Sequence, residues 1–169
     1  QNHEIAQAGP DGRFAAETEE VSPEKLVSLA LHLRSRGNIG IAFTYNEPLV
    51  GYEYVRDTAK VAHDKGLLCV LVTNGTAALP VLKEIAPYID AMNIDLKGFT
   101  DRYYREVLKG DRAMVMDFIR EAAGRCHVEL TTLIIPGEND TTEEMLELSA
   151  WVASVGKDIP LHISRFFPR

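Results

Sequence analysis

Apolar positions along this chain follow two periods, one typical of amphipathic helices and the other typical of buried strands. After the helix-start signal Ser22-Pro23-Glu24, apolar residues recur every three to four positions until Gly37. An apolar run follows, and the order of helix then strand repeats to the end of the chain. Strands are predicted at 39–44, 67–72, 91–94, 128–135 and 161–166. Further helices are predicted to begin near Pro48, Leu79, Thr100, Val115 and Thr141.

Helices between successive strands predict a parallel α/β fold. A chain of 169 residues is long enough for one domain but short for a complete eight-stranded barrel. We therefore expect a single domain over residues 1–169. An open flavodoxin-like sheet is the alternative, although the sequence has no phosphate-cradling Gly-rich loop.

Short polar motifs stand where four of the predicted strands end. They are Asn46-Glu47-Pro48, Thr73-Asn74-Gly75, Asp95-Leu96-Lys97-Gly98 and Pro136-Gly137-Glu138-Asn139-Asp140. Because parallel sheets and barrels collect their ligand chemistry at the carboxyl ends of their strands, the motifs predict one shared site.

Each motif also has a purely structural interpretation. Glu47 can accept hydrogen bonds from a ligand ammonium group, and Asn46 can donate and accept, but the same residues can form a turn that caps the next helix. Thr73-Asn74-Gly75 is by itself an ordinary turn. Asp95 and Lys97 lie on the same side of a strand, where they can bind carboxylate or hydroxyl groups or form a local ion pair.

The last two strands add further candidates. Alternation puts Glu129 and Thr131 on one side of an otherwise apolar strand, where they serve a site or form a structural pair. Arg165, near the end of the final strand, can clamp a carboxylate. For His162 the favoured interpretation is an ordinary core histidine.

The net charge and the cysteine content limit which partners and which cellular location the sequence favours. With 18 basic and 25 acidic side chains the net charge is −7, which argues against nucleic acid and anionic membranes. Cys69 lies in an apolar run, where a buried inert thiol is expected, and Cys126 precedes another such run. The two cysteines form neither a disulfide framework nor a metal motif, so a cytoplasmic location is expected. No apolar run is long enough to span a membrane.

Taken together, the motifs resemble radical S-adenosylmethionine enzymes, especially the AmmeMemoRadiSam branch, which is related to the activating enzymes of pyruvate formate-lyase. The segments that carry the resemblance occur in family order over essentially the whole chain. They are residues 1–7, Thr44-Tyr45-Asn46-Glu47-Pro48, Val72-Thr73-Asn74-Gly75, residues 93–99, residues 131–137 and His162-Ile163-Ser164-Arg165-Phe166.

The resemblance implies a partial (β/α)6 TIM-like barrel with a [4Fe–4S] cluster and S-adenosylmethionine at its mouth. The family holds the cluster with a C-x3-C-x2-C loop after the first strand, and Gln1 resembles the residue directly after the third cysteine. We therefore expect the first strand and the cluster loop to lie N-terminal to this chain. Five of six βα units would remain, with an exposed sheet edge, and the fragment alone would be inactive.

The resemblance also implies positions around the cofactor. Glu47 would face the cofactor's ammonium group, Asp95 and Lys97 would line its methionine and ribose side, and the Ile135-Pro136 turn with Asn139 would lie near the adenine. The expected cofactor-binding residues are Asn46, Glu47, Thr73, Asn74, Asp95, Lys97, Thr131, Ile135, Asn139 and Arg165. No residue of this chain is assigned to catalysis or to metal ligation.

The implied activity is reductive cleavage of S-adenosylmethionine to a 5′-deoxyadenosyl radical, which abstracts hydrogen from a substrate or a glycyl-radical partner. A protein substrate and an electron donor are the expected macromolecular partners. Val72 stands where the pyruvate formate-lyase activators carry Asp, and Phe167 where relatives offer a histidine to the cofactor. Two alternatives remain: an aldolase-like barrel with Lys97 as Schiff-base nucleophile, and a non-catalytic barrel that binds a nucleotide or a partner.

Overall fold

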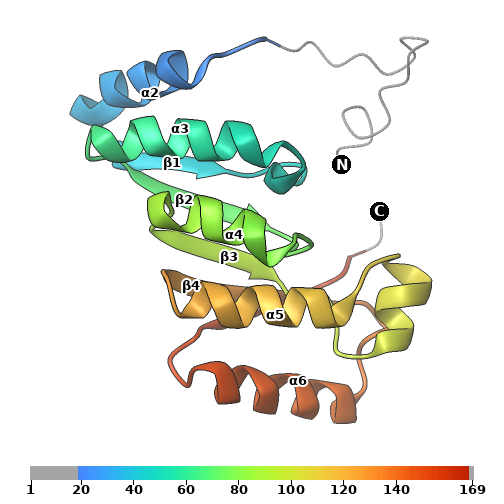
Figure 1. The fold of residues 1–169 in the computed structure, drawn as a ribbon. Helices are drawn as coiled ribbons and strands as arrows, with labels where there is room; N and C mark the ends of the chain where they lie inside the picture. Colours follow the sequence, from blue (N-terminus) through green and yellow to red (C-terminus); the bar gives the residue numbers. More distant parts are fainter. Residues whose placement is uncertain (1–18, 168–169) are drawn as a thin grey trace, which may run out of the picture.

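The computed structural model describes residues 19–167, which form one five-stranded parallel sheet with helices packed along it (Figure 1). The strands are β1 (Gly40–Phe43), β2 (Leu68–Thr73), β3 (Ala91–Asp95), β4 (His127–Ile134) and β5 (Leu161–Arg165). The α-helices are α2 (Pro23–His32), α3 (Tyr52–Asp64), α4 (Leu79–Ile85), α5 (Arg112–Ala123) and α6 (Thr142–Val155). Shorter helical turns are η1 (Leu33–Arg36), η2 (Pro48–Gly51), η3 (Ala86–Tyr88) and η4 (Tyr103–Val107). The predicted strands are confirmed to within one residue at each end.

The strand order is β1-β2-β3-β4-β5, so the chain advances by one strand at every crossover. Since such crossovers are right-handed, all of the connecting helices pack on the same face of the sheet, as Figure 1 shows. A flavodoxin-like sheet reverses direction and carries helices on both faces. The observed order therefore excludes that alternative for residues 19–167 and agrees with a partial barrel.

The core lies between the sheet and the helices, because alternate strand residues point toward them. Cys69 and Leu71 of β2 and Ile94 of β3 have no exposed surface. Burial raises the pKa of the Cys69 thiol to about 11, which confirms an inert core cysteine. The intervening residues, such as the paired Asn93 and Glu129, alternate to the other face of the sheet. No helix of residues 19–167 covers that face, which we call the open face.

The helix starts differ from the sequence pattern near Pro48 and Val115, since α5 begins at Arg112, and agree with it at Thr141. Pro48 begins the short turn η2, and α3 begins only at Tyr52. The Thr141 hydroxyl caps α6 by accepting from the Glu144 N–H at 3.2 Å, as predicted. Thr141 and Glu144 have the spacing of a capping box, but its reciprocal bond is not formed, because the Glu144 carboxylate accepts from the buried Phe99 N–H at 2.5 Å instead.

Within residues 19–167, none of the helices combines the length and the apolar character that crossing a bilayer requires.

Candidate functional site

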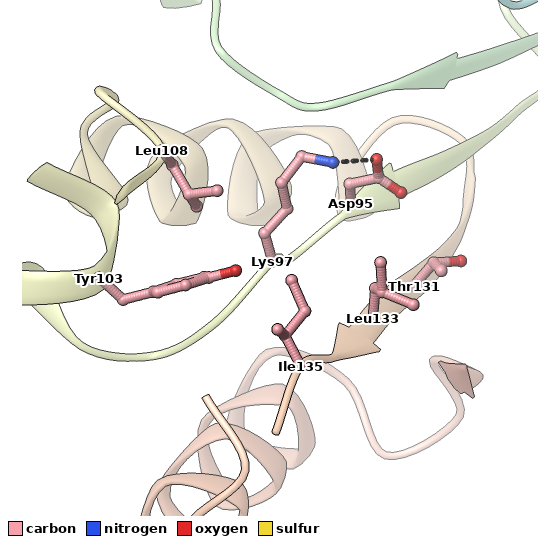
Figure 2. A pocket seen from close by; sticks show the side chains of 7 residues that line it. All are labelled: Asp95, Lys97, Tyr103, Leu108, Thr131, Leu133 and Ile135. Atoms are coloured by element: carbon pink, nitrogen blue, oxygen red, sulfur yellow. Dashed lines mark hydrogen bonds and ion pairs between the residues drawn. The ribbon is translucent and has the colours of Figure 1, made fainter. Parts of the chain in front are cut away.

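The polar motifs that follow β1, β2 and β3 meet in one cleft at the carboxyl end of the sheet. The cleft consists of two adjoining cavities that share Asp95 and Lys97. The polar half, of about 180 Å³, is lined by Thr44, Tyr45, Asn46, Glu47, Val72, Thr73, Asn74, Asp95 and Lys97. The apolar half, of about 380 Å³, is lined by Asp95, Lys97, Tyr103, Leu108, Thr131, Leu133 and Ile135 (Figure 2). The structure therefore brings most of the predicted site residues together.

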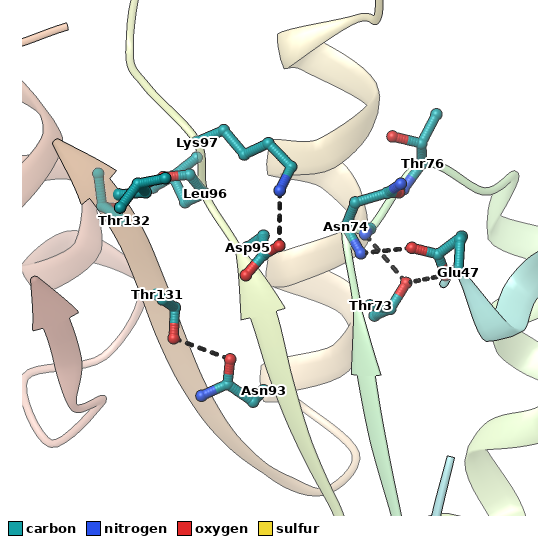
Figure 3. Close-up of polar contacts among 12 residues, drawn as sticks. Glu47, Thr73, Asn74, Thr76, Asn93, Asp95, Leu96, Lys97, Thr131 and Thr132 are labelled. Atoms are coloured by element: carbon teal, nitrogen blue, oxygen red, sulfur yellow. Dashed lines mark hydrogen bonds and ion pairs between the residues drawn. The ribbon is translucent and has the colours of Figure 1, made fainter. Parts of the chain in front are cut away.

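Glu47 ties the ends of β1 and β2 together inside the polar half (Figure 3). Its Oε1 accepts hydrogen bonds from the Thr73 hydroxyl at 2.6 Å and from the Leu49 N–H at 3.1 Å. Its Oε2 accepts from the Asn74 N–H at 2.7 Å. The helix-capping interpretation of Glu47 is thus confirmed, and the same carboxylate also lines the cleft.

The Thr73-Asn74-Gly75 turn is fixed by Gly75. This glycine has φ +68°, a conformation that residues with a Cβ rarely adopt, and an added Cβ would lie 3.0 Å from Cγ2 of Ile94. Both constraints hold the turn close to the core, so that Thr73 and Asn74 reach Glu47.

Asp95 and Lys97 point to the same side of β3, as their spacing predicted, and form an ion pair with Nζ 2.6 Å from Oδ2. Their side chains are 33% and 40% exposed, so the pair contributes little to stability. Both charged groups face the cleft, where a ligand group can replace Lys97 as the partner of Asp95, or Asp95 as the partner of Lys97.

Asn139 lies behind the wall of the apolar half and has no exposed surface. Its carbonyl oxygen accepts from the Ile135 N–H at 2.7 Å, and its Nδ2 donates to the carbonyl oxygens of Lys97 and Leu133 at 2.7 and 2.9 Å. The structure thus corrects the predicted cofactor contact, because the chain itself uses the amide of Asn139. This side chain braces the two walls of the apolar half.

The structure does not bring Arg165 to the cleft. Arg165 is paired with Ile134, on the sheet face opposite to Thr131 and Leu133, and its guanidinium lies 5.4 Å from the centre of the Phe167 ring. The predicted carboxylate clamp is therefore corrected, since strand alternation turns this side chain away from the open face.

His162 is not the core histidine that its strand position favoured, because its side chain is 52% exposed on the open face. Its Nε2 lies 2.7 Å from Glu129 Oε2, and His127 Nε2 lies 3.2 Å from Glu129 Oε1. Hydrogen bonds from His162 and then His127 hold the pKa of the Glu129 carboxyl below its usual range. Period-two alternation places Glu129 beside His127, but the bond to β5 depends on sheet register.

Tyr103 and Leu108 are lining residues that the sequence pattern did not identify. They lie at the two ends of the π-helical turn η4, where the Leu108 N–H donates to the Tyr103 carbonyl at 3.1 Å. Regular helical spacing would put Val107 on the same face as Tyr103, yet Val107 is 45% exposed. The hydrogen bond between residues five positions apart turns Leu108 inward instead. No pattern in the sequence predicts this π-helical bond.

Residues 6–149 match the Radical SAM superfamily. The chain belongs to this superfamily. Over 170 residues it is 36% identical to the uncharacterized protein MJ0808 of Methanocaldococcus jannaschii, covering 99% of this chain and 48% of that protein. It is 22% identical to the pyruvate formate-lyase 1-activating enzyme of Escherichia coli K12 over 143 residues, covering 81% and 58%. This radical SAM chain therefore spans about half the length of the curated relatives it matches.

Among solved structures, this radical SAM chain is similar to Streptococcus suis SuiB bound to S-adenosylmethionine. The TM-score is 0.73 at 9% identity, with 92% of this chain and 36% of SuiB covered. At this identity the likeness shows the fold, which is the partial TIM-like barrel expected from the sequence.

The residues of this radical SAM chain do not supply a cluster ligand set. Its two cysteines are Cys69, in the core behind the sheet, and Cys126, next to the amino end of β4. Neither lines the cleft. Within residues 19–167, no three His, Cys, Asp or Glu side chains are grouped in a way that could hold a metal ion.

Proposed function

We propose that this chain is the S-adenosylmethionine-binding core of a radical SAM enzyme whose [4Fe–4S] cluster is held by cysteines outside this sequence. The observation that carries the proposal is the joined cleft, with a polar and an apolar half that share the Asp95–Lys97 ion pair. S-Adenosylmethionine has the same two-part character, with a charged amino-acid end and a flat nucleoside end.

The residues of the polar half suit the charged end of the cofactor. A carboxylate offers about four acceptor positions, and the chain uses three on Glu47, which leaves one for the ammonium group. The Asp95 carboxylate can bind the sulfonium group or the ribose hydroxyls of the cofactor. Lys97 supplies a cation for the carboxylate of the cofactor's methionine part. Asn46, Thr73 and Asn74 line the same half.

The apolar half suits the adenosine end. Leu108, Leu133 and Ile135 present apolar surface on which a purine ring can pack, and Thr131 adds one hydroxyl. Excluding water there strengthens the polar contacts around Asp95 and Lys97.

In this superfamily, S-adenosylmethionine with a [4Fe–4S] cluster supplies a 5′-deoxyadenosyl radical that abstracts hydrogen from a substrate. The part of this chain is to bind and orient the cofactor. We extend the proposal to a protein or peptide substrate, glycyl-radical proteins included, and to a separate electron donor. The relative named for activating pyruvate formate-lyase supports a protein substrate.

Isothermal titration of S-adenosylmethionine into the full 169-residue chain tests the binding proposal. Asp95→Asn and Lys97→Met should each weaken binding by roughly tenfold or more, because each removes a charged hydrogen-bonding group from the cleft. Since the ion pair is partly exposed, the melting temperatures of both variants should stay close to wild type.

Asp117→Asn is the matched control. It breaks an exposed ion pair with Arg120 on the surface of α5, far from the cleft in the fold, and should bind S-adenosylmethionine as wild type does. Wild-type chain that does not bind, or cleft variants that bind as tightly as the control, would overturn the proposal.

The Schiff-base alternative has less support, because Lys97 Nζ is held in an ion pair with Asp95 and a nucleophilic lysine needs a free electron pair. Borohydride reduction in the presence of pyruvate distinguishes the Schiff-base alternative from the proposed function. Covalent labelling of Lys97 would favour the aldolase-like hypothesis. The non-catalytic alternative would gain if a longer form with the upstream segment bound S-adenosylmethionine but no iron.

A further inference from the structure

The hydroxyl of Tyr103 faces the cleft, and the described residues 19–167 leave it without a hydrogen-bond partner. Tyr103 is 2% exposed and lines the apolar half of the cleft. Its backbone N–H bonds to the Thr100 hydroxyl at 3.3 Å, but within residues 19–167 its own hydroxyl makes no hydrogen bond. Figure 2 shows this hydroxyl directed into the pocket, toward the space beside Lys97 and Ile135.

The neighbouring tyrosine shows that such a hydroxyl is normally satisfied here. Tyr104 is also buried, and its hydroxyl accepts from the Lys97 N–H at 3.2 Å. The Tyr103 hydroxyl differs, because it is not among the buried polar atoms and keeps accessible surface in the cleft. The packing of the described residues does not use this hydroxyl, which is therefore free to bond to a ligand.

The ring of Tyr103 is held in one orientation by its surroundings. A Cβ added at Gly98 would lie 2.7 Å from Cδ1 of Tyr103, so the ring packs directly against the backbone of that glycine. The π-helical bond to Leu108 fixes the backbone at the other side. The hydroxyl thus points into the cavity as a preorganised group.

We propose that Tyr103 is a ligand-binding residue whose hydroxyl donates a hydrogen bond to a ring nitrogen of a purine base in the apolar half. The inference rests on the proposed function and deepens it. Leu108, Leu133 and Ile135 provide surface for a flat ring, which fixes its plane but not its identity. In Figure 2 the Tyr103 hydroxyl lies across the pocket from Thr131, so it can select for a base that carries an acceptor at that edge.

The test uses 5′-methylthioadenosine, which has the adenosine part of the cofactor without its amino and carboxyl groups. Titrated into the full chain, it should bind Tyr103→Phe roughly fivefold more weakly than wild type, the effect of one neutral hydrogen bond. S-Adenosylmethionine should lose affinity by a similar factor. The melting temperature of free Tyr103→Phe should stay close to that of wild type, because the hydroxyl makes no hydrogen bond within the described residues.

Two further variants separate binding from folding. Tyr104→Phe leaves the Lys97 N–H without its acceptor and should lower the melting temperature. Tyr88→Phe, in η3 where the ring packs against His63, should leave both the affinity and the fold unchanged.

The outcomes distinguish this inference from the proposed function. If wild type binds both ligands and Tyr103→Phe binds them equally well, the inference is overturned and the proposed function stands. A Tyr103→Phe variant that is destabilised as strongly as Tyr104→Phe would also overturn it, since its hydroxyl would then have a partner in the protein. If wild type binds neither ligand, the proposed function fails and the inference fails with it.

Discussion

Asn139 connects three backbone groups that belong to the two walls of the apolar half. It accepts from Ile135 after β4 and donates to Lys97 after β3 and to Leu133 within β4. One amide side chain therefore takes part in a hydrogen bond with each of these three backbone groups. The shape of the cleft at this point is set by a residue that does not touch it.

Asn139→Ala should therefore lower the free energy of unfolding by about 3 kcal/mol, because it removes the three hydrogen bonds of a fully buried amide side chain. Urea denaturation followed by circular dichroism measures the change. Asp140→Ala is the control: its exposed carboxylate accepts only from Gly137 at 3.0 Å, and its loss should cost less than about 1 kcal/mol. Equal effects for the two variants would contradict the bracing role.

Glu129 links β4 to β5 across the open face through His162 and contacts His127 on its own strand. The pKa of this carboxyl is lowered by the bond from His162 first and by that from His127 second. A lowered pKa in the folded state means that the folded protein holds this carboxylate ionised to lower pH than the unfolded chain does.

The stabilisation from Glu129 should be fully present above the ordinary pKa of a glutamate, about 4.3, and should be lost as the pH falls through the lowered folded pKa. Wild type should exceed Glu129→Gln in urea midpoint at pH 6, and the difference should shrink as the pH falls. Glu147→Gln, on the exposed surface of α6, should show no such convergence. A constant difference for Glu129→Gln across this range would refute the linkage.

At the scale of elements, α6 begins where it can support the loop that follows β3. Thr141 caps the helix, while the Glu144 carboxylate, 6% exposed, reaches the Phe99 N–H. Arg112, at the start of α5, donates to the Phe99 carbonyl at 2.6 Å and stacks on the Phe99 ring. Two helix N-termini thus hold the loop that leads from Lys97 to η4.

Glu144→Ala should destabilise the protein by about 2 kcal/mol, because the buried Phe99 N–H loses a charged acceptor. Thr141→Ala removes a helix cap alone and should cost about 1 kcal/mol. Amide hydrogen exchange separates the two: only Glu144→Ala should accelerate exchange at Phe99. Glu143→Ala, exposed in the same turn, should leave exchange at Phe99 unchanged.

At the scale of the whole molecule, the helices cover one face of the sheet and the described residues leave β1 paired only with β2. The outer side of β1 has no strand partner within residues 19–167, and Ile39 beside it is 70% exposed. Unpaired N–H and C=O groups on an edge strand favour pairing with another chain.

The chain should therefore self-associate with increasing concentration, and Ile39→Lys should weaken the association several-fold by placing a charge at the edge. Sedimentation equilibrium over a range of concentrations measures it. Leu146→Lys, at a 64% exposed position on α6, is the control and should associate as wild type does. A monomer at all concentrations would show that this edge is not available for pairing.

The sequence by itself was sufficient to predict the strands, their parallel direction and the end of the sheet at which the polar motifs gather. Strands buried beneath helices must be apolar throughout their covered positions, so runs such as Leu67 to Val72 predict their own boundaries. Polar residues at the ends of these runs then have one edge in common. Asn46, Glu47, Thr73, Asn74, Asp95 and Lys97, which this rule brings to one edge, all line the cleft, as do Thr131, from strand alternation, and Ile135, from the family resemblance.

Only the tertiary structure decided which polar groups face a ligand and which are used by the chain. Alternation puts Arg165 on the other side of its strand from His162, but only the pairing of Arg165 with Ile134 shows that this side is away from the open face. Asn139 is internal because two walls converge on it, and Leu108 reaches the cavity because a π-helical turn replaces the regular period. These outcomes depend on contacts between distant segments or on a local backbone geometry, and residue spacing alone specifies neither.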